Sequence, residues 1–270
     1  MDFSEINARG LVLLGCGKIG SAMLAGWLDG GIAAGAVTVV DPAPSAWLQG
    51  TGVSLNTALP ESPAVVIIAV KPQMIGEALP AIRGLGTGAT LFISVAAGTP
   101  LARFEDILGA QSPIIRAMPN TPAAVGRGIT ALIGNACATE AALELGEGLL
   151  AAVGQTVRIE DEVQMDAVTA VSGSGPAYVF HLIETMAAAG EAEGLAPDLA
   201  LKLARATVAG AGELAEAAGE DPAQLRINVT SPKGTTEAAL GVLMDERRGF
   251  PILLRDAVAA AARRSRELGK

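Results

Sequence analysis

The segment LVLLGCGKIGSAMLAGWL, residues 11–28, decides the fold of this chain. Four aliphatic residues lead into the pattern G-x-G-x-x-G, formed by Gly15, Gly17 and Gly20, and a run with helical spacing follows. In a strand-turn-helix unit such glycines allow a tight turn, close approach of a pyrophosphate to the backbone, and close packing of helix on strand. The free N–H groups at the helix start favour an anion. The segment therefore predicts a dinucleotide site at the first strand of an α/β domain.

The next segment supplies a second part of this fingerprint. VTVV at residues 37–40 predicts a strand, and Asp41 follows it, 21 residues after Gly20. A carboxylate here accepts a hydrogen bond from a ribose 2′-hydroxyl and repels a 2′-phosphate, which favours NADH. Ser45 lies close by and has a hydroxyl suited to a phosphate, although residues 37–50 contain no Arg or Lys. These residues leave the coenzyme preference open.

Short apolar runs continue this pattern to about residue 160. They are VVIIAV (65–70), TLFISV (90–95), PIIRAM (113–118), ITALIG (129–134) and QTVRI (155–159). Runs of this length without polar alternation are typical of a parallel sheet covered on both faces. Residues 1–160 are therefore predicted to form an α/β, Rossmann-type, doubly wound domain that binds the dinucleotide.

From residue 161 the strand signals stop, and Ala, Leu and Glu at helical spacing fill most of the chain, notably residues 179–218 and 237–243. Residues 161–270 are therefore predicted to form an all-helical domain for substrate binding and dimerisation. This half is rich in Ala and Gly, so each helix needs a closely packed partner. We expect that partner to be a second copy of the chain, with a tight monomeric bundle as the alternative.

Composition limits the partners and the compartment. The net charge of −9 argues against nucleic acid or an anionic membrane surface as a partner. Two cysteines, Cys16 and Cys137, are too few for a disulfide framework or a metal cluster, so we expect a reducing compartment and no metal. The first ten residues lack the apolar core of a secretory signal, and the longest aliphatic run is far below the ~20 residues that span a bilayer. A cytoplasmic location is expected.

Ligands of doubly wound sheets lie beyond the carboxyl ends of the strands, which draws attention to two further segments. Residues 69–72, AVKP, place Lys71 in an extended position before a proline, either as a coenzyme contact or as a solvated loop lysine. Residues 94–98, SVAAG, end the next strand with small residues that leave room for a flat ring. Cys16, inside the glycine loop, is interpreted as a space-filler rather than a redox sensor.

Groups that can donate a proton are scarce. His181 is the only histidine and lies in the apolar run YVFHLIE, where an interior or interface role is favoured over catalysis. Reduction of a ketone normally needs a positioned proton donor. A protonated imine brings its own proton and positive charge, so its site needs mainly correct positioning.

Two hydroxyl-rich motifs make the prediction of function more specific. They are VSGSGPAYVF (171–180) and NVTSPKGTTEAAL (228–240). Together with the glycine loop, AVKP, SVAAG and RAMPNTP, they occur in an order and spacing that resembles the pyrroline-5-carboxylate reductase family over nearly the whole length. The resemblance implies reduction of Δ1-pyrroline-5-carboxylate to L-proline, the last step of proline biosynthesis. It also implies NADPH as the default coenzyme, with NADH possible because of Asp41, and a homodimer of interlocked helices that in some members assembles into a decamer.

The resemblance also implies site residues. The coenzyme contacts are Gly15, Cys16, Gly17, Lys18, Ile19, Gly20, Asp41, Asn56, Ala69, Val70, Lys71, Pro72, Val95, Ala96, Ala97 and, from the partner's helical domain, Asn228. The substrate contacts are Ser231, Gly234, Thr235 and Thr236, with Thr236 and Ser174 as the catalytic pair. We expect the N–H groups of residues 234–236 to hold the carboxylate, the Thr236 hydroxyl to lie by the imine nitrogen, and Ser174 both to cap a helix and to contact substrate. Lys233 departs from the family, which often has glycine there.

Two other functions are weighed against this reading. A β-hydroxyacid-dehydrogenase-like oxidoreductase has a similar layout, but a lysine is expected on the helix after its glycine-rich hinge, and residues 178–190 contain none. A non-enzymatic dinucleotide sensor would bind coenzyme without turnover. The complete substrate motif argues against the sensor.

Overall fold

The computed structural model describes residues 3–86 and 88–269 and contains two compact units. The first comprises the chain up to Gly173 together with the residues from Ala261 onward, and the second is Ser174–Ala260. In this division residues 161–173, which we assigned to the helical domain, pack with the sheet. The domain boundary between residues 160 and 161 stays a prediction.

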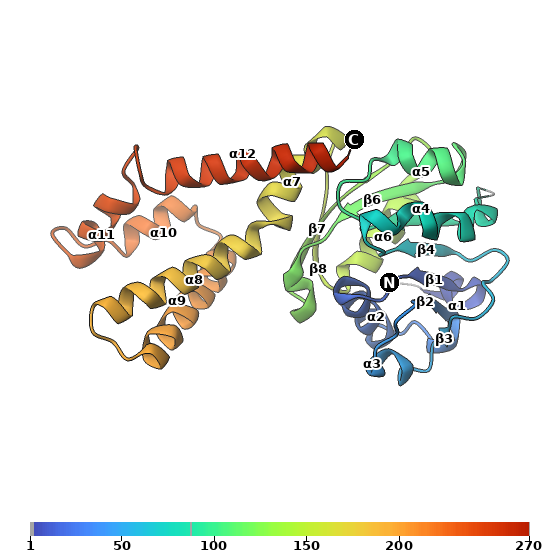
Figure 1. The fold of residues 1–270 in the computed structure, drawn as a ribbon, viewed down its shortest axis with the longest axis horizontal. Coiled ribbons are helices and arrows are strands. Elements are labelled where there is room, and N and C mark those ends of the chain that lie inside the picture. Colours follow the sequence, from blue (N-terminus) through green and yellow to red (C-terminus); the bar gives the residue numbers. More distant parts are fainter. Residues whose placement is uncertain (1–2, 87, 270) are drawn as a thin grey trace. The chain divides into compact units, whose positions relative to one another are not determined.

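The first unit is built on one eight-stranded sheet of order β3-β2-β1-β4-β5-β6-β7-β8 (Figure 1). The strands are β1 (Leu11–Leu14), β2 (Val37–Val40), β3 (Ser54–Leu55), β4 (Val65–Ile68), β5 (Leu91–Ser94), β6 (Ile114–Met118), β7 (Gly128–Gly134) and β8 (Gly154–Arg158). All seven predicted runs form strands. The two-residue β3 was not predicted, because it is too short to carry a hydrophobic pattern.

One strand pairing differs from the expected parallel sheet. β6 and β7 are antiparallel, with Ile115 opposite Gly134, so the expectation of a parallel sheet is wrong at this pair. The cause is the connection, since only residues 119–127 separate the two strands and a parallel crossover needs a dozen or more. The other pairs are parallel, including β7 with β8.

Helices cover both faces of this sheet, as the doubly wound prediction requires. The helices of this unit are α1 (Ser4–Arg9), α2 (Lys18–Asp29), α3 (Ala46–Gln49), α4 (Ile75–Ala78), α5 (Leu101–Leu108), α6 (Glu140–Ala151), α7 (Met165–Val168) and the end of α12 (Phe250–Leu268). Alternate strand residues point to opposite faces, so Leu13 packs in one cluster with α1, α2 and α6, whereas Leu14 packs in another with α4 and α5. Short 3₁₀ turns occupy Ala34–Ala36, Pro72–Met74, Leu79–Leu85, Thr121–Val125 and Glu162–Gln164.

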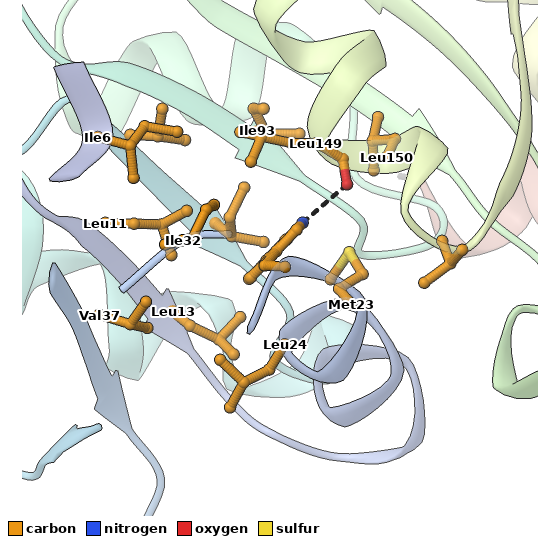
Figure 2. Close-up of a cluster of buried hydrophobic side chains, with 14 of the residues drawn as sticks. Ile6, Leu11, Leu13, Met23, Leu24, Ile32, Val37, Ile93, Leu149 and Leu150 are labelled. Atoms are coloured by element: carbon orange, nitrogen blue, oxygen red, sulfur yellow. Dashed lines mark hydrogen bonds between the residues drawn. The ribbon is translucent and has the colours of Figure 1, made fainter. Parts of the chain in front are cut away.

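A buried tryptophan ties two of these helices together. Trp27 of α2 is inaccessible to solvent, and its indole Nε1–H donates a hydrogen bond of 2.7 Å to the carbonyl oxygen of Leu149 in α6. Figure 2 shows this bond among the aliphatic side chains of the same face of the sheet. The bond satisfies the only polar atom of the indole, so the ring fills the core without a desolvation penalty.

Residues 162–166 fasten the segment that leaves the sheet. The Glu162 carboxylate accepts a hydrogen bond of 2.7 Å from buried Arg116 of β6 and one of 2.8 Å from the N–H of Leu101, the first residue of α5. Asp166 accepts a hydrogen bond of 2.6 Å from the hydroxyl of Ser265, which lies buried in α12. Both segments that connect the two units are thus anchored to the first unit.

Among the described residues of the second unit, every regular element is a helix, in agreement with the prediction. It contains α8 (Gly175–Ala192), α9 (Pro197–Ala218), α10 (Pro222–Asn228), α11 (Thr235–Leu243) and the beginning of α12. The expected continuous helical run breaks at Gly194, where φ is +96°. Consequently α8 and α9 lie side by side (Figure 1). Ala187, Ala200 and Ala204 are buried between them.

Within the described residues no helix combines the length and the apolar character needed to cross a membrane.

Candidate functional site

The glycine loop has the geometry that a bound pyrophosphate requires. Gly15 has φ +85°, a conformation that residues with a Cβ rarely adopt. A Cβ on Gly20 would lie 2.5 Å from the Gly15 carbonyl oxygen, so this position packs the helix against the turn. A Cβ on Gly17 would meet nothing within 4 Å. Gly17 therefore borders open space at the start of α2, where no side chain caps the helix, and the loop fits a dinucleotide phosphate.

Asp41 is fixed beside this loop by backbone donors. One carboxylate oxygen accepts from the Cys16 N–H at 2.7 Å, and the other accepts from the Ala43 N–H at 2.8 Å. Asn56, with φ +52°, uses its amide to bond both the N–H and the C=O of Asp41. The structure thus brings Asp41 and Asn56 to the glycine loop, with Asn56 shaping the turn that presents the carboxylate.

Two side chains near Asp41, those of Cys16 and Ser45, are a buried thiol and a helix cap. The Cys16 thiol is buried. Its pKa is raised to about 11, mainly by burial and to a smaller degree by the negative charge of Asp41. The thiol is therefore protonated near neutral pH, which agrees with its interpretation as a space-filler. The Ser45 hydroxyl accepts from the Leu48 N–H at 3.2 Å and caps α3.

The segments after β4 and β5 lie at the same edge of the sheet as the glycine loop, because β1, β4 and β5 are adjacent and parallel. Ala69 and Val70 are half-buried, and Lys71 is exposed in the extended conformation expected before Pro72. Ala96 is buried and its N–H bonds the Ser94 hydroxyl at 3.3 Å, while Val95 and Ala97 are half-buried. The edge also receives Asp41 from β2, so the predicted coenzyme residues of the first unit share one surface.

The loop before α11 in the second unit offers unused N–H groups. Gly234 is the N-cap residue, and no side chain caps the helix. Its own N–H donates to the Ser231 carbonyl at 3.0 Å, which closes the turn. Thr236 is half-buried and Thr235 is exposed. The first N–H groups of α11 are therefore available to a carboxylate, as helix starts generally are.

Lys233 has a backbone conformation that its sequence position did not reveal. Its φ is +60°, in the left-handed region where glycine is favoured. This conformation explains why glycine suits the position, and nothing in the structure explains why lysine replaces it. Its N–H donates to the Glu237 carboxylate at 2.7 Å, which holds the turn closed.

Three residues singled out in the sequence make contacts that the sequence did not indicate. Ser174 occupies the N-cap position of α8 but makes no capping hydrogen bond, so its capping role is wrong and its substrate role stays a prediction. The Asn228 amide accepts from Gln224 at 2.8 Å and donates to Glu220 at 3.1 Å. The His181 side chain is 72% exposed and bonds Glu184, so an interior position in this chain is excluded.

One residue of the hydroxyl-rich motif escaped the sequence analysis. Ser172 has a buried hydroxyl oxygen that meets no hydrogen-bond partner among the described residues. The only available signal was its place in the SGSG sequence beside Ser174. Across residues 3–86 and 88–269, no three His, Cys, Asp or Glu side chains gather in a way that could hold a metal ion.

Comparisons with known proteins cover both halves of the chain. Residues 162–268 match a family model described as pyrroline-5-carboxylate reductase dimerisation, and residues 11–98 match one described as NADP oxidoreductase coenzyme F420-dependent. The pyrroline-5-carboxylate reductase of Pseudomonas aeruginosa is 38% identical over 266 residues, which cover 96% of this chain and 97% of the relative. That of Pisum sativum is 38% identical over 264 residues, covering 96% and 95%.

Solved structures agree with the sequence relatives. A pyrroline-5-carboxylate reductase from Coxiella burnetii has a TM-score of 0.90 and 32% identity, covering 97% of this chain and 99% of that one. The Plasmodium falciparum enzyme, solved with NADP bound, has a TM-score of 0.84 and 28% identity, covering 98% and 99%. Similarity at this level over nearly the full length of the compared chains leaves one conclusion: this chain belongs to the pyrroline-5-carboxylate reductase family.

Proposed function

We propose that the chain reduces the C=N bond of Δ1-pyrroline-5-carboxylate to L-proline, by hydride transfer from a nicotinamide dinucleotide. The observation that carries this proposal is the uncapped start of α11, where Thr235 and Thr236 present N–H and hydroxyl groups together directly after Gly234. A cyclic imine with a carboxylate needs both kinds of group. The glycine loop of the first unit supports the coenzyme part of the proposal.

The substrate role is assigned to residues of the second unit. The N–H groups of Thr235 and Thr236 hold the carboxylate, whereas the Gly234 N–H, which we also expected to contribute, is occupied by the Ser231 carbonyl. Gly234 borders the site as its N-cap residue, and the hydroxyls of Ser231 and Ser174 contact the ring. The Thr236 hydroxyl lies by the imine nitrogen and orients it. Because the protonated imine already carries a positive charge, the site needs mainly to position the substrate, and no strong acid is required.

The coenzyme role is assigned to the shared edge of the sheet. The pyrophosphate contacts the loop from Gly15 to Gly20, and residues 69–72 and 95–97 line the continuation of the site. When bound, the reduced nicotinamide supplies the hydride. Asn228 is assigned to the coenzyme of the partner chain, which requires its amide to exchange its present bonds for a ligand.

We further propose that NADH is preferred, although NADPH is the family default. Asp41 is a half-buried carboxylate fixed by two backbone N–H groups, so it cannot turn away from a 2′-phosphate without breaking them. Each carboxylate oxygen has a further lone-pair site for a ribose hydroxyl.

Replacing Asp41 by asparagine tests this preference. The change removes the charge and keeps the shape, so we expect the ratio of kcat/KM for NADPH to that for NADH to rise by about tenfold or more. Steady-state rates with each coenzyme measure it. Ser45→Ala is the control, because its hydroxyl caps α3, and it should leave the ratio unchanged. An unchanged ratio in Asp41→Asn would mean that Asp41 does not select the coenzyme.

The activity itself is tested by mixing the purified chain with pyrroline-5-carboxylate and either NADH or NADPH and following coenzyme oxidation. Turnover with at least one coenzyme is expected. Absence of turnover with both would reject the proposed function. Coenzyme binding without oxidation would instead favour a sensor.

The assembly is proposed to be a homodimer formed by the helical unit. Its helices expose large apolar side chains, including Val179, Phe180, Leu199 and Leu203, and a groove of about 560 Å³ lies between α8 and α9. Exposed apolar surface on this scale is typical of an interface.

A cytoplasmic location stays a proposal, supported by two free cysteines.

Light scattering during gel filtration tests this assembly. We expect twice the mass of one chain, and ten chains if dimers assemble into a decamer. Phe180, which is 62% exposed, is expected to bury its ring in the dimer, so Phe180→Glu should shift the mass towards one chain. A monomeric wild-type protein would contradict the proposed dimer.

A further inference from the structure

The Ser172 hydroxyl is a buried polar group without a bond. Its oxygen is closed off from solvent and, among residues 3–86 and 88–269, finds no hydrogen-bond partner. Burying a hydroxyl without a partner is unfavourable, and most such groups in proteins are paired. The residue as a whole is half-buried, and a serine side chain has three staggered rotamers. An unpaired hydroxyl of this kind is suited to meeting a ligand.

The backbone around Ser172 is also unusual. Thr169–Gly173 form a π-helical turn immediately before α8. Turns of this type are rare in proteins, and those that occur are often found at functional sites. The hydroxyl and the turn are separate observations, because one concerns a side chain and the other the backbone. Both observations involve Ser172.

The position of Ser172 relative to the sheet identifies the region it serves. A Cβ on its neighbour Gly173 would lie 2.5 Å from the terminal methyl carbon of Met118, the last residue of β6. Ser172 therefore lies near the carboxyl end of β6, within the first unit. That end belongs to the same edge as the ends of β4 and β5, because the three strands are adjacent and parallel.

The strand order divides this edge between the two halves of a dinucleotide. In doubly wound sheets the coenzyme extends across the point where the strand order reverses, here between β1 and β4. Asp41 at β2 marks the adenosine side, so the nicotinamide belongs on the side of β4, β5 and β6. Ala96 and Ala97 after β5 leave room there for a flat ring.

We propose that the Ser172 hydroxyl forms a hydrogen bond with the carboxamide of the bound nicotinamide ring. The carboxamide has one acceptor oxygen and two N–H donors, and a serine hydroxyl both donates and accepts, so either direction is possible. The bond gives the orphaned hydroxyl its partner and fixes the rotation of the ring. This inference rests on the proposed function, since it assigns a residue to the nicotinamide half of the same site.

Binding measurements with matched ligands test the proposal. Isothermal titration of Ser172→Ala with NADH should give a Kd about fivefold to tenfold above that of the wild-type protein, as loss of one hydrogen bond does. The Kd for ADP-ribose, which lacks the nicotinamide, should not change. If NADPH proves the better coenzyme, NADPH and 2′-phospho-ADP-ribose form the equivalent pair.

Thermal unfolding separates this role from a structural one. Without ligand, Ser172→Ala should unfold at the same temperature as wild type or higher, because the substitution removes an unpaired buried hydroxyl. The matched control is Ser112→Ala, at the amino end of β6, where the buried hydroxyl donates to the Leu108 carbonyl at 2.9 Å. That variant should unfold at a lower temperature and bind NADH normally.

Three results would overturn the assignment. They are an unchanged Kd for NADH in Ser172→Ala, an equal loss for NADH and ADP-ribose, and a loss of affinity for substrate alone. A wild-type protein that binds NADH without turning over substrate would reject the proposed function and leave the Ser172 measurement valid. The two failures are therefore distinguishable.

Discussion

Replacement of Gly17 by alanine is expected to raise the Kd for coenzyme by about tenfold to a hundredfold, because a methyl group would hold the pyrophosphate away from the backbone N–H groups. The free protein should tolerate the change. A Cβ at this position meets nothing within 4 Å, and its φ of −70° suits any residue. Only the small loss from placing alanine at a helix N-cap should lower the unfolding temperature.

Two other glycines provide controls for this experiment. Gly20→Ala would place a Cβ 2.5 Å from a backbone oxygen, so it should reduce both coenzyme affinity and thermal stability. Gly35→Ala, which also adds a Cβ in open space but lies before β2, should change neither. Titration calorimetry and thermal unfolding of the three variants give the comparison. Normal coenzyme binding by Gly17→Ala would show that the phosphates do not approach this loop.

Thr236→Ala is expected to lower kcat by about tenfold to a hundredfold, the usual effect of removing one positioned hydrogen bond in a site. Thr236 lies in the first turn of α11 and is half-buried, and we assign its hydroxyl to the imine nitrogen. The carboxylate is held by N–H groups that the substitution leaves in place. The effect should therefore appear in kcat more than in the KM for substrate.

Thr236→Ser is the matched variant, since it keeps the hydroxyl and removes only a methyl group. It should retain most of the activity. Coenzyme affinity should be the same in both variants and in wild type, because the residue is assigned to substrate alone. Unchanged kinetics in Thr236→Ala would reduce Thr236 to an ordinary residue at the start of a helix.

The fold was predictable where a single segment carries the whole signal. Residues 11–28 hold a strand, a turn and a helix within one local pattern, so the glycine loop followed directly from the sequence. The antiparallel pairing of β6 with β7 was not predictable in the same way, because the apolar run of β7 is compatible with either direction. The length of the connection decides it, since the predicted runs leave only residues 119–128 between them, too few for a parallel crossover. That signal was present in the sequence and was not used in the prediction.

The candidate site was predictable to a smaller degree. Chain position located the loop before α11, yet it gave no reason for Lys233, whose left-handed backbone only coordinates reveal. Ser174 has the residue type and position of a helix cap, but its hydroxyl makes no such bond. Ser172 was overlooked because an unpaired hydroxyl is a property of its surroundings rather than of its sequence.

Transfer of a deuterium label shows whether hydride passes from a nicotinamide to the imine carbon of pyrroline-5-carboxylate. NADH deuterated at both C4 positions is incubated with the purified protein and substrate, and the proline formed is analysed by mass spectrometry. We expect one deuterium in each proline, on the ring carbon that carried the C=N bond. Absence of proline, or proline without deuterium at that carbon, would contradict it.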